Sequence, residues 1–268
     1  MQKHINRQKS ILGQNFILDR DMLLSLLDCC DLSKDDTVLE IGAGLGTLTE
    51  VLADNVKKLV SLEIDKSLMP YLKLIADKKN NIELINEDFL RWDMDSYFSD
   101  APEIKVVANI PYYITSDIYH KLIFSKLKIT EINCMVQLEV AQKLAAGVKD
   151  KGSYGTLTLL CKHKYEVTIE KIVPKENFSP IPKVDSAFVC MKLKDSYKSD
   201  NDFDKEYYRI VKSAFLHRRK TLVNSLKSSG YDPGEVLKSL DDLGLNPKCR
   251  AEELQYEDYI ALTTKLKI

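Results

Sequence analysis

The chain has 268 residues, 44% of them apolar, and its 39 Lys and Arg nearly balance 40 Asp and Glu, for a net charge of −1. This is typical of a globular protein with one large domain, with or without a small second one, that needs neither disulfides nor a metal to stabilise its core. The balanced charge excludes a uniformly basic nucleic-acid-binding protein, so any nucleic acid must contact a local basic face.

The expected compartment is the cytoplasm. The first nine residues are basic and lack an apolar core, so we expect no secretory signal. No run approaches ~18 consecutive apolar residues, so we expect no membrane span. The six cysteines have no C-x-x-C spacing and no histidine at ligand spacing, which favours reduced thiols and no bound metal.

The larger, N-terminal part of the chain alternates short apolar runs with helical patterns, which is typical of β-α-β units and a mostly parallel sheet. Two later runs, 166–169 and 187–191, have no helix between them and predict an antiparallel pair at the sheet edge. The predicted parallel strands span residues 37–41, 59–64, 82–85, 105–108 and 132–136.

The pattern changes after Leu193. Residues 195–202 are polar and predict a connecting loop, and apolar residues recur at helical spacing from Phe203 onward. We therefore expect an α/β domain over residues 1–194, including a basic N-terminal arm, and a small all-α domain over residues 203–268.

Three glycines, Gly42, Gly44 and Gly46, lie between the first predicted strand and a helix. Glycine permits a tight turn and a close approach of the backbone to a ligand, and a helix N-terminus offers free N–H groups. Glu63 follows Gly44 by 19 residues, near the end of the next strand, where a carboxylate can accept hydrogen bonds from both ribose hydroxyls. The combination predicts a nucleoside-containing cofactor, whereas the plainer alternative is a glycine turn without a ligand.

The spacing and charge favour S-adenosylmethionine over a dinucleotide. The third glycine comes one position earlier than in the dinucleotide fingerprint G-x-G-x-x-G. Glu40, just before the glycines, suits a ligand with an ammonium and a sulfonium better than a pyrophosphate. Asp88, after the third strand, can accept from the adenine amino group, although an aspartate there is more often a helix cap.

The run Asn109-Ile110-Pro111-Tyr112 follows the fourth predicted strand. Pro111 keeps Ile110 out of the helical region and ends the strand ladder. The Asn109 side-chain oxygen and the Ile110 carbonyl can hold the two N–H groups of an adenine amine and free its delocalised lone pair, so that catalysis rests on alignment. Tyr112 offers a ring for a base removed from its stack. A strand end with a turn is the plainer alternative.

Several motifs together resemble the ribosomal RNA adenine dimethyltransferases, over nearly the whole chain. The resemblance implies a Rossmann-like class I S-adenosylmethionine-dependent methyltransferase fold, a mostly parallel sheet with an antiparallel edge, and a helical domain that binds RNA. The motifs are Gly13-Gln-Asn-Phe16, Glu40-Ile-Gly-Ala-Gly-Leu-Gly46, Asn109-Ile-Pro-Tyr112, Phe178-Ser-Pro-Ile-Pro-Lys-Val-Asp-Ser186, Phe215-Leu-His-Arg-Arg-Lys-Thr-Leu222 and Arg250-Ala-Glu-Glu-Leu254.

The resemblance also implies residue roles. The catalytic residues it implies are Asn109, Ile110, Pro111 and Tyr112, with Phe178 as the opposing aromatic wall for the flipped base. The cofactor residues it implies are Asn15 and Ile17 at the methionine end, Gly42 in the glycine turn, Glu63 at the ribose, Asp88 at the adenine, and Asn109 between cofactor and target amine.

The motifs favour the branch of the family that dimethylates two adjacent adenosines near the 3′ end of small-subunit rRNA. Ile110 and residues 115–118 are similar to the large-subunit, antibiotic-resistance branch, but residues 182–186 and 218–222 favour the small-subunit branch. The expected partner is the small-subunit rRNA within an immature small subunit, bound by a monomer without a membrane or a metal. Two further alternatives are a ribosome assembly factor with secondary methylation activity and a nicotinamide dehydrogenase, the latter disfavoured by the glycine spacing.

Positive charge gathers in two places. Arg218, Arg219 and Lys220, with Arg209 and Lys212 shortly before them, predict a basic helical face that contacts RNA phosphates. Lys3, Arg7 and Lys9 form the N-terminal arm. A solvated helix face is the plainer interpretation of either cluster.

Overall fold

The computed structural model describes residues 15–266 of the chain. Contacts divide the chain into two compact units, Met1–Ala141 with Val167–Leu193, and Gln142–Glu166 with Lys194–Ile268. The predicted domain limits differ from this division, because residues 142–166 group with the helical unit rather than with the α/β unit. The predicted N-terminal arm with Lys3, Arg7 and Lys9 lies outside the described residues.

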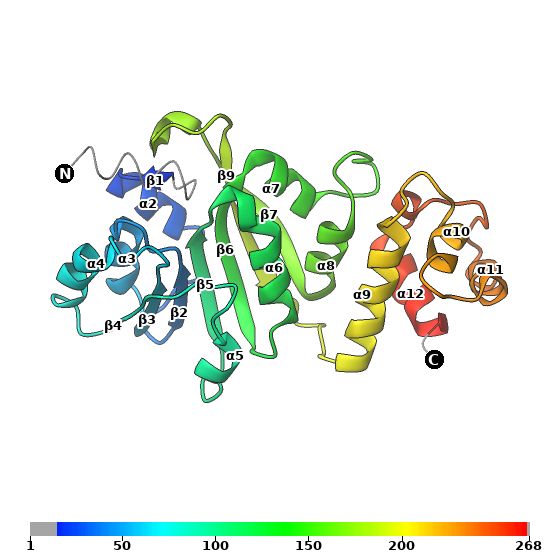
Figure 1. Ribbon diagram of the computed structural model, residues 1–268, viewed down its shortest axis with the longest axis horizontal. Helices are drawn as coiled ribbons and strands as arrows, with labels where there is room; N and C mark the ends of the chain where they lie inside the picture. The colour runs from blue at the N-terminus through cyan, green and yellow to red at the C-terminus, as the bar shows by residue number, and fades with distance from the viewer. Residues whose placement is uncertain (1–14, 267–268) are drawn as a thin grey trace. The chain divides into compact units, whose positions relative to one another are not determined.

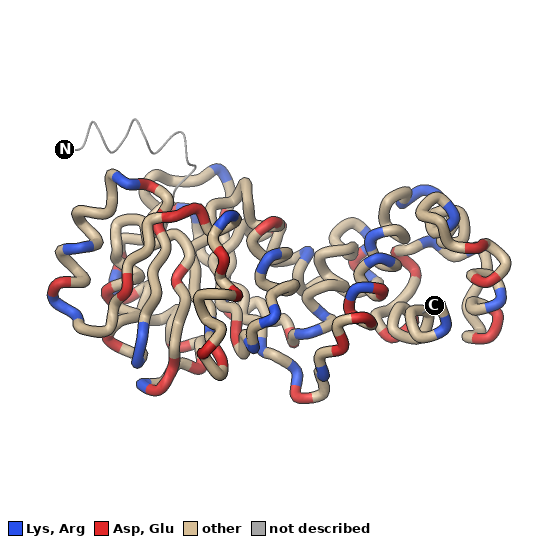
Figure 2. Tube along the Cα trace, turned by 60° about the horizontal axis from the view of Figure 1, so that its bottom comes forward, with Lys and Arg blue, Asp and Glu red and all other residues tan. Residues whose placement is uncertain are grey.

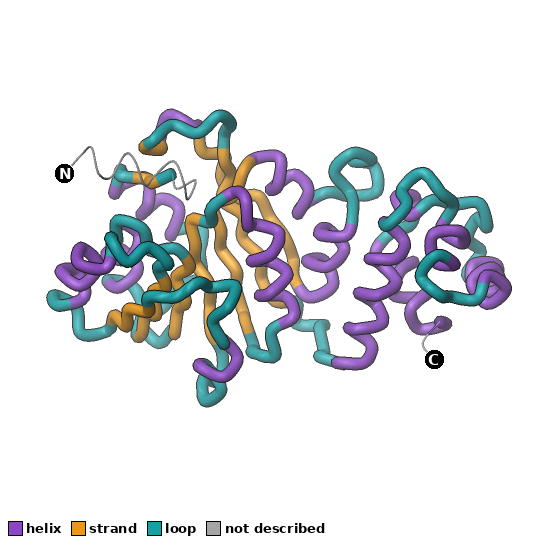
Figure 3. The backbone as a smooth tube through the Cα atoms, in the orientation of Figure 1, coloured by secondary structure: helices purple, strands orange, loops and turns teal. Residues whose placement is uncertain are grey.

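A seven-stranded sheet with the order β4-β3-β2-β5-β6-β9-β7 organises the first unit (Figures 1 and 3). The neighbours from β4 to β6 pair in parallel, and β6 pairs with β9 in antiparallel fashion. The predicted α/β fold with a mostly parallel sheet and an antiparallel edge is therefore confirmed. The strands are β2 (Thr37–Ile41), β3 (Lys58–Leu62), β4 (Ile82–Ile85), β5 (Ile104–Asn109), β6 (Ile129–Gln137), β7 (Tyr165–Val173) and β9 (Ser186–Leu193).

Helices connect the parallel strands. Aspartate side chains start some of them: Asp19 accepts from the amides of Asp21 and Met22, and Asp93 accepts from the amide of Ser96. The helices are α2 (Arg20–Leu27), α3 (Thr47–Ala53), α4 (Met69–Ala76), α5 (Met94–Tyr97), α6 (Thr115–Phe124) and α7 (Leu138–Ala145), with short 3-10 turns η1 (Tyr112–Ile114) and η2 (Lys175–Asn177).

The strand order reverses between β2 and β5. From β2 the chain runs outward through β3 to β4, then returns to place β5 on the other side of β2. In doubly wound sheets, ligands bind outside the carboxyl ends of the strands at such a switch point. The fold therefore brings together, at one edge, the ends of β2, β3, β4 and β5.

A separate two-stranded sheet pairs β1 (Phe16–Ile17) with β8 (Phe178–Ser179). Phe16 lies opposite Ser179 and Ile17 opposite Phe178. The sequence did not predict this pairing, which places the start of the described chain beside the Phe178–Ser186 motif.

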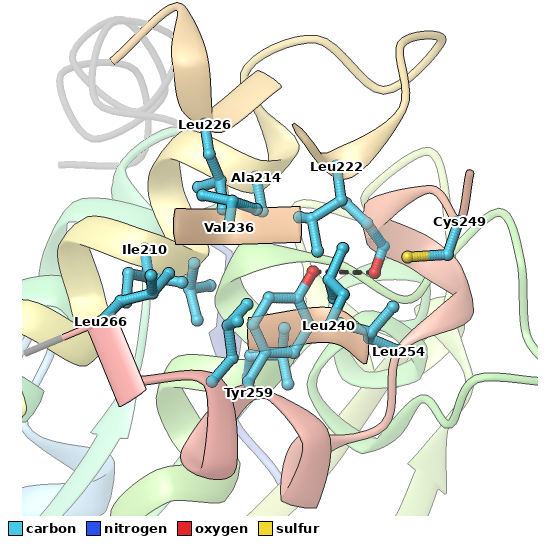
Figure 4. Close-up of a cluster of buried hydrophobic side chains, with 14 of the residues drawn as sticks. Ile210, Ala214, Leu222, Leu226, Val236, Leu240, Cys249, Leu254, Tyr259 and Leu266 are labelled. Carbon is cyan, nitrogen blue, oxygen red and sulfur yellow. Dashed lines mark hydrogen bonds between the residues drawn. The ribbon is translucent and has the colours of Figure 1, made fainter. Parts of the chain in front are cut away.

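The second unit is helical and has its own apolar core (Figure 4). Tyr207, Ile210, Val211 and Ala214 are buried on one face of α9, as the helical spacing predicts. Within this core the Tyr259 hydroxyl donates to the carbonyl oxygen of Ala251 at 2.8 Å. The elements are α8 (Thr156–Lys164), α9 (Asn201–Phe215), α10 (Leu222–Lys227), α11 (Pro233–Asp242), η3 (Ala251–Glu253) and α12 (Tyr256–Leu266).

The packing of the glycine turn against α4 can be tested at Gly46, which precedes α3. Its φ is +83°, and an added Cβ would lie 2.3 Å from Ile75 Cδ1 and 3.1 Å from Leu72 Cδ2. We expect Gly46→Ala to lose roughly 1–3 kcal/mol from backbone strain, and a further amount from the overlap with α4. Gly230→Ala is the control, since Gly230 has φ +94° and no atom within 4 Å of the added Cβ. Equal losses in the free energy of unfolding, measured with denaturant, would contradict the packing argument.

Candidate functional site

A cavity of about 180 Å³ opens at the carboxyl ends of β2, β3, β4 and β5. Its charged lining residues are all acidic: Glu63, Glu87 and Asp88. Within the part of the chain that the structure describes, no Lys, Arg or His lines it. The other residues lining it are Asn15, Phe16, Ile41, Gly42, Gly44, Leu62, Ile64, Phe89, Leu90, Asn109, Ile110, Pro111, Tyr112, Tyr113, Ile114 and Ile118.

The glycine turn forms the floor between β2 and α3. Gly42, Gly44 and Gly46 all have positive φ, which L side chains rarely adopt. The amides of Gly42 and Ala43 both donate to the Leu62 carbonyl at 2.9 Å. A Cβ on Gly44 would lie 2.5 Å from the Phe16 ring. The glycines are therefore required both for the turn and for the close approach of the segment that contains Phe16.

Glu63 lies directly after β3 and is only 1% exposed, yet it lines the cavity. Oε2 accepts from the amide of Gly44 at 2.7 Å, and Oε1 accepts from the amide of Asp65 at 2.8 Å. Burial raises the pKa of this carboxyl, while the backbone hydrogen bonds oppose the shift. Each oxygen retains a further lone pair for a hydroxyl. Because Gly44 already donates to a carboxylate, the turn is poorly suited to a pyrophosphate.

Glu40 does not reach the cavity, which corrects the expectation that it faces a cationic ligand. It is 0% exposed, and Oε2 accepts from the Ser61 hydroxyl of the neighbouring β3 at 2.6 Å. Burial raises the pKa of Glu40 to about 7, although the hydrogen bond from the Ser61 hydroxyl favours the charged form. Its carboxyl is bound to Ser61 and is absent from the cavity lining, so the acidic character of the cavity comes from Glu63, Glu87 and Asp88.

Asp88 combines the two alternatives that its sequence position left open. Oδ1 accepts from the Leu90 amide at 2.9 Å, as in a turn or cap, and the residue also lines the cavity. Oδ2 lies 3.7 Å from Nε of the exposed Arg91. The carboxylate is thus fixed by its own loop and stays at the edge of the cavity, where it can accept from a ligand.

The end of β5 places the Asn109 side chain in the cavity wall. Its Nδ2 donates to the carbonyl of Asn15 at 2.8 Å. A carbonyl only accepts, so this bond fixes the orientation of the amide and leaves Oδ1 as the acceptor for a ligand. Ile110 is 1% exposed and its amide donates to the Met135 carbonyl at 3.2 Å. The ladder with β6 ends at Asn109, opposite Met135, so the Ile110 carbonyl lies beyond it.

Tyr112 lies in the 3-10 turn that follows Pro111, and its hydroxyl is 2.7 Å from Oγ of Ser186. Ser186 is fully buried at the start of β9, opposite Gln137 of β6. The ring of Tyr112 is therefore fixed to the central sheet at its far end. Burial raises the pKa of the Tyr112 hydroxyl, so it stays protonated at neutral pH. Ser186 belongs to the Phe178–Ser186 motif, but its contact with Tyr112 was not predicted from the sequence.

Comparison with known proteins decides the family. A model described as ribosomal RNA adenine dimethylase matches residues 5–267. Ribosomal RNA small subunit methyltransferase A of Ligilactobacillus salivarius is 37% identical over 96% of this chain and 90% of that protein, and the protein of the same name from Streptococcus agalactiae is 36% identical over 100% and 94%. The chain belongs to the ribosomal RNA adenine dimethylase family.

Two solved structures agree with this membership. The crystal structure of the 23S rRNA methyltransferase ErmE has a TM-score of 0.73 at 28% identity and covers 95% of this chain and 100% of its own. A dimethyladenosine transferase from Plasmodium falciparum has a TM-score of 0.78 at 26% identity and covers 92% and 95%. The Rossmann-like methyltransferase fold that the motifs imply is confirmed.

Two residues that the dimethylase resemblance implies for the site, Ile17 and Phe178, do not line this cavity, and their roles toward a ligand stay predictions. Ile17 and Phe178 are 3% exposed, belong to one buried apolar cluster with Leu23 and Phe188, and are absent from the cavity lining. The Ile17 carbonyl accepts from the Thr47 hydroxyl at 3.1 Å. In this structure both residues support the β1–β8 pair, and the aromatic side chains that line the cavity are Phe16, Phe89, Tyr112 and Tyr113.

Along the trace of the helical unit, Lys and Arg are interspersed with Asp and Glu (Figure 2), and within the predicted basic cluster Arg218 makes contacts of its own. Nη2 of Arg218 donates to the carbonyls of Lys151 and Tyr154 at 3.2 and 3.1 Å and lies 3.4 Å from Glu252 Oε2. These contacts tie Arg218 to its own unit, although it is exposed, as Arg219 and Lys220 are.

Two absences concern the described residues alone. Between residues 15 and 266, no group of three or more His, Cys, Asp or Glu side chains is placed to hold a metal ion. None of the helices in that range is long and apolar enough to cross a bilayer.

The buried Glu40 gives a prediction for stability against pH. Its pKa is raised from 4.5 to about 7 in the folded chain, so folding favours the protonated form. This group therefore stabilises the fold least above pH 7, and stability is lost as the pH rises from 4.5 toward 7. Relative to Glu40→Gln, we expect the wild type to lose on the order of 2–3 kcal/mol between pH 5 and pH 8.

Chemical denaturation at several pH values measures this difference. Glu50→Gln, at a half-exposed position of α3, is the control for removing a glutamate that is not buried. A wild-type and Glu40→Gln pair whose stabilities stay parallel across the range would contradict the burial argument.

Proposed function

We propose that this protein uses S-adenosylmethionine to dimethylate N6 of two adjacent adenosines in the 3′-terminal hairpin of small-subunit rRNA, acting as a monomer in the cytoplasm on immature small subunits. The observation that carries the proposal is the Asn109 amide, fixed by Asn15 with its oxygen left for a ligand in an acidic cavity. The most similar relatives reported above are named for the small subunit at 36–37% identity, whereas ErmE, named for 23S rRNA, is 28% identical.

The cavity fits the proposed donor in its charge and in its hydrogen-bond acceptors. S-adenosylmethionine, when bound, supplies an electrophilic methyl group on a sulfonium. Glu63 can accept from both ribose hydroxyls, because each of its oxygens uses only one lone pair on the backbone. Asp88 can accept from the adenine amino group. An exclusively acidic set of charged lining residues favours a cation over a phosphate.

The chain's own groups then act on the target amine. Oδ1 of Asn109 and the carbonyl of Ile110 accept its N–H groups, which draws the nitrogen toward tetrahedral geometry and frees its lone pair. The Tyr112 ring, fixed through Ser186, offers a surface on which the extruded base stacks. The rate gain comes from holding nitrogen and methyl in line, for which alignment alone can supply several orders of magnitude.

Asn109→Ala tests the role of the amide. We expect methyl transfer to fall by at least about 10²-fold, as is usual when a positioning hydrogen bond to the reacting group is lost. Binding of S-adenosylhomocysteine should persist, since Glu63 and Asp88 remain. Isothermal calorimetry and single-turnover transfer measure the two properties separately. Near-normal turnover in a folded Asn109→Ala protein would refute the proposed mechanism.

The substrate is tested with labelled S-adenosylmethionine and three acceptors: undermethylated small subunits, mature small subunits and large-subunit RNA. Label confined to undermethylated small subunits and recovered as dimethyladenosine is the expected result. Label in large-subunit RNA would instead favour the activity for which ErmE is named. Small-subunit assembly that needs the chain but not Asn109 would favour an assembly factor.

Arg219 and Lys220 are proposed to contact RNA phosphates, with Arg218 acting through its own unit. We expect the double variant Arg219→Ala/Lys220→Ala to reduce the salt dependence of RNA binding by about 1–2 in the slope of log K against log salt concentration. Arg218→Ala should chiefly lower the stability of the helical unit. A double variant with an unchanged salt slope would show that these side chains are only solvated.

A further inference from the structure

Lys121, on α6, joins two parts of the cavity wall that are distant in sequence. Its Nζ donates to the carbonyl oxygens of both Phe89 and Trp92, and it lies 4.9 Å from the centroid of the Phe89 ring. The side chain of Lys121 is thus bound to the segment between β4 and α5. Neither the motifs nor the comparisons give this residue a role.

The segment that Lys121 contacts includes Asp88, one of the acidic residues that line the cavity. Asp88, Phe89 and Leu90 line the cavity, and Asp88 accepts from the Leu90 amide. The amides of Arg91 and Trp92 both donate to the Asp88 carbonyl at 2.9 Å. The carbonyls of Phe89 and Trp92, in the same turn, are the acceptors to which Lys121 donates.

The charges around Lys121 favour its ammonium form. Burial lowers the pKa of Lys121, but the carboxylates of Asp88, Asp93, Asp95 and Glu87 act in the opposite direction. The one other cation recorded near Asp88 in the described chain is Arg91, whose side chain is 86% exposed. A single, partly buried ammonium thus bonds the turn and offsets the repulsion among four neighbouring acids.

We propose that Lys121 is a positioning residue that sets the Asp88 carboxylate and the Phe89 ring for the adenine of the donor. The inference rests on the proposed function, since it assigns that end of the cavity to adenine. Lys121 lies on the helix that begins three residues after Tyr112. Lys121 therefore also links the segment with Asp88 and Phe89 to the helix that follows Tyr112, on which the target base is proposed to stack.

The test compares two nucleoside ligands that differ at one position of the purine. S-adenosylhomocysteine presents an amine to Asp88, whereas S-inosylhomocysteine presents a carbonyl oxygen that a carboxylate repels. We expect the wild type to prefer the adenosyl ligand by at least about tenfold in Kd, because a site built for a hydrogen bond rejects a partner that cannot make it.

Lys121→Met keeps the length and apolar stem of the side chain but removes its three donors and its charge. We expect the preference to fall below about threefold, with adenosyl binding weakened and inosyl binding little changed. Lys128→Met is the matched control, because Lys128 is exposed and pairs with Glu103 at 2.8 Å, away from the Asp88 segment. Its preference should equal that of the wild type.

Each outcome bears on a different claim. A folded Lys121→Met protein that retains the wild-type preference overturns the role of Lys121 and leaves the proposed function intact. A wild type that binds neither ligand overturns the proposed function and the inference with it. Where melting shows that Lys121→Met does not fold, Lys121→Gln, which keeps a donor for one carbonyl, is expected to lower the preference, and an unchanged ratio there overturns the inference.

Discussion

The hydrogen bond from the Asn109 amide to the Asn15 carbonyl is the contact on which the rest of the site depends. It fixes which end of the amide faces the cavity, and it does so with an acceptor from a segment 94 residues earlier in the chain. That segment is held in turn by the pairing of β1 with β8. After β8 the chain reaches Ser186, which bonds to Tyr112. Asn109 and Tyr112 are thus joined both through the backbone and through this longer path.

This closed path explains why the Phe178–Ser186 motif matters although Phe178 lies in the core. Phe178 is buried with Ile17 and Phe188, so its ring stabilises the β1–β8 pair. The motif then acts at its two ends: β8 supports Asn15, and Ser186 holds the Tyr112 hydroxyl. A polar residue that is fully buried, such as Ser186, needs a hydrogen-bond partner. Here the partner is Tyr112, one of the aromatic residues that line the cavity.

Much of the sheet was predictable because its strands are short β-branched runs separated by helices. The runs at 37–41 and 82–85 coincide with β2 and β4, and the others differ at their ends. The glycine turn and Glu63 were equally accessible, since their spacing follows from the β-α-β unit. The pairing of β1 with β8 was not, because two-residue strands have no periodicity to detect. The grouping of residues 142–166 with the helical unit was also not predictable, because an apolar helix face does not reveal which element it packs against.

Glu40 and Glu63, the two glutamates near the glycine turn, show that the sequence also does not predict which way an individual side chain points. Glu40 lies within β2, where every side chain must point to one side of the sheet or the other, and it meets Ser61 of β3. Glu63 lies just beyond β3, where the backbone is free to turn the carboxylate toward the glycine amides. Both residues are acidic and both adjoin a strand end, so residue type does not distinguish them. They differ in where they lie relative to the last residue of the strand, since Glu40 comes before it and Glu63 after it.

The acidic lining also bears on how a proton is handled in the proposed reaction. The titratable side chains that line the cavity are Glu63, Glu87, Asp88, Tyr112 and Tyr113. Glu63 is bound to two amides, Asp88 to its own turn, and Tyr112 to Ser186. A base is not needed before methyl transfer, because the amine becomes acidic only once it carries the methyl group and then loses its proton readily. The site therefore requires neutral acceptors held in fixed positions, and an amide oxygen and a main-chain carbonyl meet that requirement.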